Sequence, residues 1–234
     1  MCIFDTMQEF NPDYFKVALS TSVVVFGFDG NQLLTLIGSK PHEPYLNAPT
    51  LPTSWVLPEE DVEEVARREM INALGEHEYY LEQLTAFAKL YRKPEGRVVN
   101  IAHYCLVHHE LALKKPSEGY NWVPLAEIPQ MVYDHNDIYT YAKERLKRRV
   151  KRRPIGFRLL PKEFTFNEIH TLYEQALSKE LDKRNFRKKF LKSELLILLD
   201  KTVTTEGSKK PSGLYTFNEK RYEKMTLKGY DFVF

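Results

Sequence analysis

Hydrophobic and polar residues change their spacing along the chain, and each change marks an expected strand, helix or loop. Residues 15–28 are rich in β-branched and aromatic side chains, and the same pattern resumes at residues 32–37 after Asp29-Gly30-Asn31. Two such segments around an Asp-Gly turn predict a β-hairpin. Four prolines among residues 40–54 indicate a surface loop. Further strands are expected at 84–91, 97–108 and 120–124, with residues 92–96 joining the first two as a hairpin.

Before residue 154, apolar residues recur at helical spacing in two segments. Apolar groups recur on one face between residues 59 and 74, and Gly75 is a natural helix end. A longer helix is expected to be capped by Asp137 and to end near Lys151, before Pro154. Its last part, KERLKRRVKRR, holds eight basic residues and one acid. We interpret it as a basic linker helix that closes the first domain.

The last third of the chain has a compact order of elements. Thr165 and Glu168 have the spacing of a capping box, and an apolar stripe follows them. Asp182 is placed to cap a second helix, in which Phe186 and Phe190 share one face. Two strands are expected at 195–205 and 214–217, joined by a basic tip. A helix, a turn, a basic helix and a hairpin form the layout of a winged helix-turn-helix.

Composition sets the broad class. A chain of 234 residues with 43% hydrophobic residues is able to form a packed core. No segment approaches the roughly 18 consecutive apolar residues of a membrane span, and the N-terminal segment lacks the pattern of a secretory signal. The two cysteines give neither a disulfide framework nor a thiolate metal cluster. These features predict a cytoplasmic protein.

The formal net charge of +2 conceals a strong asymmetry. Residues 143–234 contain 24 Lys and Arg against 12 Asp and Glu, whereas the preceding part has more acidic than basic residues. The asymmetry predicts two domains with different partners, and nucleic acid is the usual partner of a basic domain. Two ordinary solvated surfaces are the alternative interpretation.

The basic helix of the last third is the candidate for DNA recognition. Asn side chains suit adenine and Arg side chains suit guanine, while lysines on a hairpin tip would hold the phosphate backbone. A solvated basic helix packed by two phenylalanines is the plain alternative. The predicted DNA-binding residues are Lys183, Arg184, Asn185, Arg187, Lys188, Lys192, Lys209 and Lys210.

Residues 55–75, WVLPEEDVEEVARREMINALG, resemble the signature of the Nudix hydrolases, G-x5-E-x7-R-E-U-x-E-E-x-G-U, in which U is a bulky aliphatic residue. In a Nudix hydrolase, carboxylates on one helix face hold Mg²⁺ ions that neutralise a pyrophosphate and activate water. The resemblance implies a Nudix fold around this helix. The residues that match in register are Glu60, Arg68, Glu69, Met70 and Gly75.

The departures from this signature concern the metal-binding positions. Asn72 and Ala73 stand where the paired glutamates belong, Glu76 replaces the closing aliphatic residue, and Ser54 falls on the first glycine. Glu69 alone is a poor Mg²⁺ site, because a hard cation needs more than one fixed carboxylate. We therefore expect no hydrolase activity, no bound metal and no cofactor. The alternative is an active hydrolase with an altered site made of Glu60, Glu63, Glu64 and Glu69.

A Nudix-like domain followed by a winged helix resembles the Nudix-related transcriptional regulators. Residues 91–106, 133–135, 154–161 and 182–190 carry the likeness. It implies a homodimer that binds operator DNA and responds to a small molecule. One branch of that family responds to ADP-ribose and controls NAD synthesis, and another, from gut Bacteroidetes, responds to pentoses. The sequence is more similar to the second branch, so we expect control of sugar-utilisation genes.

By the same resemblance, the effector would occupy the former substrate cleft. Arg92, Arg97, Asn100 and Tyr104 lie on or near the expected hairpin beside it and would bond hydroxyl or phosphate groups. Each has an ordinary alternative role as a strand-surface or core residue. Three nearby histidines, at positions 103, 108 and 109, fit no metal-ligand spacing and are expected to be structural.

The expected fold class is α+β, with a Nudix-like α/β/α sandwich over residues 1–153 and a winged helix-turn-helix domain over residues 154–234. The expected function is a DNA-binding regulator whose operator affinity changes when a small metabolite binds. Two alternatives stay open, a Nudix-type pyrophosphohydrolase of a nucleoside diphosphate derivative and an adaptor whose basic domain docks to an acidic protein.

Overall fold

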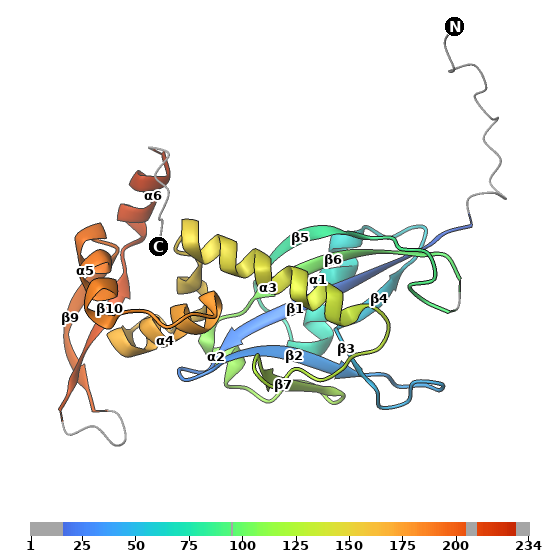
Figure 1. Cartoon of the computed structure of the whole chain (residues 1–234), viewed down its shortest axis with the longest axis horizontal. Coiled ribbons are helices and arrows are strands. Elements are labelled where there is room, and N and C mark those ends of the chain that lie inside the picture. Colours follow the sequence, from blue (N-terminus) through green and yellow to red (C-terminus); the bar gives the residue numbers. More distant parts are fainter. Residues whose placement is uncertain (1–15, 95, 205–209, 228–234) are drawn as a thin grey trace, which may run out of the picture.

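The computed structural model describes residues 16–94, 96–204 and 210–227. Figure 1 shows a larger N-terminal unit built on a β-sheet and a smaller C-terminal unit, with helix α3 (His135–Arg152) running along the sheet towards the C-terminal unit. The chain has the expected α+β class, a Nudix-like sandwich followed by a winged helix. None of the helices in the described ranges is long and apolar enough to cross a membrane.

The expected hairpin at the start of the chain is confirmed. Strands β1 (Ala18–Phe28) and β2 (Leu33–Ser39) pair antiparallel. The carboxylate of Asp29 closes the turn by accepting from the backbone N–H groups of Asn31 and Gln32, at 2.8 and 2.7 Å. An Asp side chain that bonds its own downstream backbone is the reason for its frequency in turns.

The remaining strands extend the hairpin into a larger sheet, whose main path is β3-β2-β1-β6-β5. Strand β6 pairs parallel with β1 and antiparallel with β5, whereas β4 pairs with β1 and β7 with β2. Two of these strands lie within the segment expected to be only a loop, because its backbone pairs with β1 and β2. The bounds are β3 (Pro49–Thr50), β4 (Thr53–Val56), β5 (Tyr80–Phe87), β6 (Val98–Leu106) and β7 (Tyr120–Pro124).

The connection between β5 and β6 differs from the expected tight hairpin. Strand β5 starts at Tyr80 and ends at Phe87, earlier than predicted at both ends. Tyr91 has a φ of 58°, in the left-handed region that no regular strand uses, and the next two residues, Arg92 and Lys93, turn into the protein and are buried. The connection is therefore exposed on both sides of these two residues, and only Arg92 and Lys93 reach the interior.

A helix covers each face of the sheet. Helix α1 (Val62–Leu74) packs over the face that includes Val23 and Val25, and ends at Gly75, which has a φ of 86°. Helix α3 packs over the opposite face, which includes Val24 and Phe26. Successive residues of a strand point to opposite faces, so β1 contributes to both layers.

The start of α3 corrects one expectation. The helix begins at His135 with Asp134 at the N-cap, and the expected cap, Asp137, lies in the first turn. The carboxylate of Asp134 makes no capping bond, because it is held by the guanidinium of Arg92, with Nε to Oδ2 at 2.9 Å and Nη2 to Oδ1 at 2.5 Å. The end of the helix at Arg152, before Pro154, is close to the prediction.

The C-terminal unit has the expected order of helix, turn, helix and hairpin. Thr165 and Glu168 form the capping box of α4 (Phe166–Leu177), and Asp182 caps α5 (Lys183–Ser193) by accepting from Asn185 N at 2.8 Å. Strands β8 (Phe164–Thr165), β10 (Ser212–Phe217) and β9 (Leu196–Val203) form a second sheet in that order. The short elements α2 (His109–Ala112), η2 (Ile155–Leu159), β8 and α6 (Glu219–Leu227) were not expected.

The two units are packed against each other through α4 and η2. The side-chain amide of Gln175 on α4 caps the β1–β2 turn, accepting from Leu33 N at 2.6 Å and donating to Asn31 O at 2.8 Å. The guanidinium of Arg158 lies 4.4 Å from the ring centre of Tyr80 on β5. One cluster of buried side chains runs from β1 to β10. The domain boundary expected at residues 153 and 154 stays a prediction.

Candidate DNA-binding surface and candidate ligand site

Helix α5 presents a cationic surface to solvent because its two phenylalanines are buried against α4. Phe186 and Phe190 are 4% and 0% exposed and pack on Tyr173 of α4, with ring centres 5.4 and 5.3 Å away. This packing orients the helix, so that the polar residues of the other side face solvent. The exposed predicted residues on α5 are Lys183, Arg184, Asn185, Arg187, Lys188 and Lys192.

Arg187 differs from the other cations of α5. Its Nη2 donates to the hydroxyl of Tyr215 on β10 at 2.8 Å, and its guanidinium lies 4.9 Å from the ring centre of Phe166. These contacts join α5 to β10 and α4. To contact a base, as predicted, the guanidinium of Arg187 would have to give up its hydrogen bond to Tyr215, which helps to orient α5.

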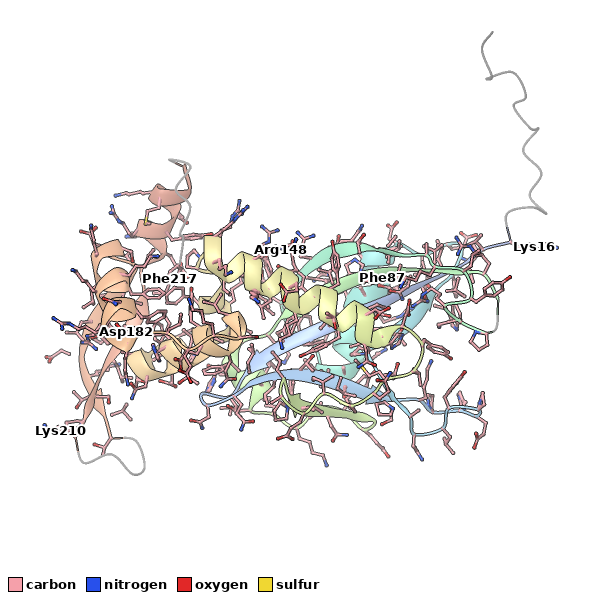
Figure 2. The ribbon with its side chains drawn as sticks, in the orientation of Figure 1. Lys16, Phe87, Arg148, Asp182, Lys210 and Phe217 are labelled. Carbon is pink, nitrogen blue, oxygen red and sulfur yellow. The ribbon has the colours of Figure 1, made fainter. Side chains whose placement is uncertain are left out.

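The hairpin of β9 and β10 lies beside α5. Lys210 is exposed close to its end, and Lys209 lies outside the described residues. Figure 2 shows Lys210 and Asp182, the cap of α5, both at the end of the molecule away from the N-terminal sheet. Helix α5 and the hairpin thus share one end of the protein, as a recognition helix and a wing do.

The Nudix-like helix α1 holds its acidic residues in structural contacts. Glu60 forms an ion pair with Arg68 and accepts from the backbone N–H of Leu57 at 2.9 Å. Glu63 pairs with Arg67 at 3.3 Å on the exposed side of the helix. In the described ranges, we find no group of three or more His, Cys, Asp or Glu residues that could hold a metal ion.

Glu69 is the buried carboxylate of this helix and is 8% exposed. Burial raises its pKa, while hydrogen bonds from Ser54 of β4, Tyr120 of β7 and Asn72 partly oppose the shift. A buried carboxylate that already has hydrogen-bond partners within the protein is less available as a Mg²⁺ ligand than a solvent-facing one. Its contacts tie α1 to two strands.

The four predicted effector residues separate into two groups. Arg92 is buried against Asp134, and Asn100, which is 0% exposed, donates to the hydroxyls of Ser20 and Ser22 at 3.0 and 2.9 Å. Both lie on the side of the sheet that α3 covers. The other two have other partners: the exposed Arg97 donates to the carbonyl of Ala88 at 2.6 Å, and Tyr104, on the same face of the sheet as Asn100, donates from its hydroxyl to Glu82 at 2.9 Å.

Several further polar and aromatic residues lie beside Arg92 and were missed as site candidates. Lys93 is 4% exposed, and its Nζ lies 4.1 Å from the ring centre of Trp55 and 4.9 Å from that of Tyr133. Lys40 Nζ lies 5.4 Å from the Tyr133 ring centre. Sequence alone offered one signal here, the polar run at residues 133–135 before a helix.

Two of the three neighbouring histidines, His103 and His109, have structural partners, and His108 is exposed. His103 is buried, and its Nδ1 is 3.0 Å from Thr21 Oγ1. His109 Nδ1 lies 2.8 Å from the carbonyl oxygen of Phe28. His108 precedes α2, where it is exposed. Together with His77 and residues 160–162, His108 and His109 line a cavity of about 310 Å³ between the two units.

Comparisons with known proteins agree with this geometry. Residues 156–217 match the family described as the NrtR DNA-binding winged helix domain. The ADPR responsive transcriptional repressor NtrR of Acinetobacter baylyi is 26% identical over 95% of this chain and 87% of the repressor. The structure of Shewanella oneidensis NrtR with a 27mer DNA covers 92% of this chain and 97% of that one, at a TM-score of 0.73 and 23% identity.

A second structure concerns the N-terminal unit. The NUDIX domain of Shewanella oneidensis NrtR, crystallised with ADP ribose, covers 62% of this chain and 99% of that one, at a TM-score of 0.51 and 22% identity. The fold and the match define the class, a Nudix-like domain joined to a DNA-binding winged helix domain. More narrowly, the chain has the architecture of the NrtR-type Nudix-related transcriptional regulators, and its residues 156–217 match their winged helix domain.

Proposed function

We propose that this protein is a DNA-binding transcriptional regulator whose Nudix-like domain senses a small metabolite. The observation that carries the proposal is the cationic face of α5, held outward by Phe186 and Phe190 inside a domain that matches the NrtR winged helix family. The Acinetobacter relative is named as a transcriptional repressor, and the Shewanella one was crystallised with DNA. Repression is therefore the first mode of regulation to test.

The sensed metabolite belongs to the chemistry of sugars, sugar phosphates or ADP-ribose. The Acinetobacter relative is named as ADP-ribose responsive, and a Shewanella domain was crystallised with ADP ribose. The likeness to the pentose-responsive branch supports sugar-utilisation genes as the regulated set. Both sources of support concern relatives, so the ligand of this chain must be found by binding measurements.

Regulation would act through the position of the winged helix. Helix α3 runs from the sheet to the C-terminal unit, and Gln175 holds α4 against the β1–β2 turn. A ligand that binds better to one placement of these parts shifts the population towards it. We propose a homodimer as the active form, because two-fold symmetric proteins match palindromic operators.

The Nudix-like domain acts as a sensor in this proposal and has no hydrolase activity. The ion pairs of Glu60 and Glu63 with arginines and the burial of Glu69 support that interpretation, because each of these carboxylates is already engaged within the protein. The competing function is hydrolysis of a nucleoside diphosphate derivative. Mg²⁺-dependent release of phosphate or nucleotide from ADP-ribose, abolished in Glu69→Gln, would establish the hydrolase instead.

The DNA-binding proposal is tested with duplex DNA from the promoter region of the chain's own gene. We expect salt-dependent binding, because lysine and arginine contacts to phosphates release counterions. Arg184→Glu and Lys188→Glu should each weaken binding by about tenfold or more. Lys115→Glu makes the same charge change at an exposed site of the N-terminal unit and is the matched control. Binding that is insensitive to salt, or equal in all three variants, would refute the proposal.

A further inference from the structure

The connection between the two units carries a dense run of positive charge. Residues 147–162, KRRVKRRPIGFRLLPK, contain eight Lys and Arg residues and no Asp or Glu. The run covers the last turns of α3, the short helix η2 and the segment that leads to β8. The contacts of these cations divide them into two groups.

Three of the eight cations have partners within the protein. Arg149 Nη2 pairs with Glu82 Oε1 of β5 at 2.5 Å, and Lys147 Nζ pairs with Glu144 Oε1 at 3.6 Å. The guanidinium of Arg158 lies over an aromatic ring of β5. The two carboxylates closest to the end of α3 in these contacts, Glu82 and Glu144, therefore each have a basic partner already.

Four other cations of the run face solvent. Arg148, Lys151, Arg152 and Arg153 are exposed, and no carboxylate of the described ranges forms an ion pair with any of them. We name these four residues the linker cations. Figure 2 shows Arg148 on the part of α3 that approaches the C-terminal unit. The linker cations therefore form a positive surface where the chain enters that unit.

Helix α3 does not balance the charge of the linker cations. Arg148 lies three and four residues before Lys151 and Arg152, a spacing at which like charges are neighbours on a helix and destabilise it. The negative end of the helix dipole amounts to roughly half an elementary charge. Most of the four positive charges are therefore uncompensated until an anionic partner approaches.

The end of α3 and helix α5 are held in a fixed arrangement by one packed core. Leu146 and Val150 on the buried side of α3 are both 0% exposed, and they belong to the same cluster of buried side chains as Tyr173 of α4. The ring of Tyr173 also packs on Phe186 and Phe190 of α5. A DNA duplex that binds to α5 would therefore have a defined position relative to the linker cations.

Duplex DNA is the polyanion that suits a positive surface in this place. A phosphate oxygen needs only a cationic side chain within reach, and arginine binds it with two parallel hydrogen bonds. A duplex continues on both sides of the groove that a recognition helix occupies, and it presents one phosphate charge about every 1.7 Å along its axis. The flanks of a duplex bound to α5 are therefore suitable partners for the linker cations.

We propose that the linker cations contact the phosphate backbone of duplex DNA beside the bases that face α5. Contacts of this kind position a protein on DNA and carry no sequence information. The linker cations precede residues 156–217, which match the winged helix family, so they add a second DNA contact outside that domain. The inference rests on the proposed DNA-binding function and extends the surface that performs it.

The salt dependence of DNA binding tests this contact, with the full chain and a duplex from the promoter region of its own gene. The linker variant combines Lys151→Gln with Arg152→Gln. The control variant combines Lys114→Gln with Lys115→Gln, which removes the same charge from adjacent exposed positions of the N-terminal unit. The linker variant should reduce the slope of log affinity against log salt by about 1.8, because each phosphate contact contributes roughly 0.9. The control variant should leave the slope unchanged.

An unrelated duplex of the same length separates phosphate contacts from base contacts. The linker variant should lose about fivefold or more in affinity for the promoter duplex and the same factor for the unrelated one, because both have the same phosphate backbone. Asn185→Ala on α5 should weaken binding mainly to the promoter duplex. A loss by the linker variant that is confined to the promoter duplex would overturn the proposal.

Hydroxyl-radical footprinting locates the contact on the DNA. The linker variant should lose protection at the outer edges of the footprint and keep it in the centre. Loss of protection across the whole footprint would mean that the variant disturbs α5, and it would overturn the proposed flank contact.

The outcome separates this inference from the regulator proposal. Equal salt slopes for the linker variant, the control variant and the unmodified chain would overturn the flank contact and leave the DNA-binding proposal intact. If the unmodified chain shows no salt-sensitive binding to duplex DNA, the regulator proposal itself is refuted, and the flank contact with it.

Discussion

The two faces of the N-terminal sheet use their charged groups in opposite ways. On the α1 face, Glu60 and Glu63 are held by arginines and Glu69 is buried against other polar side chains. On the α3 face, Arg92, Asn100 and His135 keep buried polar atoms without partners, beside two lysines and two aromatic rings. The resemblance to Nudix hydrolases directs attention to the first face. The unsatisfied hydrogen-bonding capacity lies on the second.

The two faces therefore differ in how far the protein itself satisfies their polar groups. The helix of the motif retains its packing stripe and the Arg68–Glu60 pair, which support the fold, and Glu63 and Glu69 have partners within the protein. A ligand gains most where it completes hydrogen bonds that the protein leaves open. By that criterion the α3 face is the better candidate for the sensor site.

The largest expected change in the free energy of unfolding comes from breaking the buried Arg92–Asp134 ion pair, and the exposed Arg68–Glu60 pair on the other face is the comparison. Arg92→Ala leaves the carboxylate of Asp134 unpaired at 12% exposure, and should lower the free energy of unfolding by about 3 kcal/mol or more. Arg68→Ala, in the exposed pair with Glu60, should change it far less, because solvent screens that pair. Urea unfolding of both variants measures the contrast. Equal losses would mean that the two faces do not differ in this way.

The pH dependence of stability tests the burial of His135 and, to a smaller extent, the positive charges of Lys93, Arg92 and Lys40 around it. The pKa of His135 is about 3 in the folded protein and near 6.5 when unfolded, so the unfolded state binds the extra proton first as pH falls. Stability from the neutral ring is complete above about pH 6.5 and is lost progressively towards pH 3. His135→Gln should therefore show a weaker loss of stability between pH 7 and pH 4.5 than the unmodified chain. Parallel profiles for the two proteins would contradict this account.

Glu69 provides the corresponding and smaller test on the α1 face. Burial raises its pKa in the folded state above its ordinary value of 4.5, so the folded protein favours the protonated form. The cost of ionising the carboxylate is absent below the unfolded pKa and fully present above the folded pKa. Glu69→Gln should gain stability relative to the unmodified chain as pH rises from 4 to 7. A relative loss over that range would indicate that the ionised carboxylate has a stabilising partner.

The sequence was sufficient where neighbouring residues decide the structure. The Asp29 turn, the Thr165–Glu168 capping box and the Asp182 cap depend on contacts two or three residues apart. The buried side of α5 follows from the i,i+4 spacing of Phe186 and Phe190. Helices α4 and α5 and the β9–β10 hairpin could therefore be predicted, whereas η2, β8 and α6 could not.

The sequence was insufficient where distant residues meet. Asp134 serves as a partner for Arg92, 42 residues away, and this pairing sets the start of α3. Two short strands inside a proline-rich loop exist because β1 and β2 offer them backbone partners. The approach of Lys40, Lys93 and Tyr133 depends on the same long-range pairing. The resemblance to the Nudix-related regulators indicated Arg92 and Asn100 as candidates, but not Lys40, Lys93 and Tyr133.

The central claim is that ligand binding in the N-terminal unit changes DNA binding by the C-terminal unit. It is tested by measuring the operator affinity of the full chain with and without a phosphorylated sugar. At saturating ribose 5-phosphate or ADP-ribose, we expect the operator affinity of the unmodified chain to change about fivefold or more. Lys40→Gln should lose this response while it retains operator binding in the absence of ligand. A ligand that binds with measurable affinity and leaves operator binding unchanged would contradict the account.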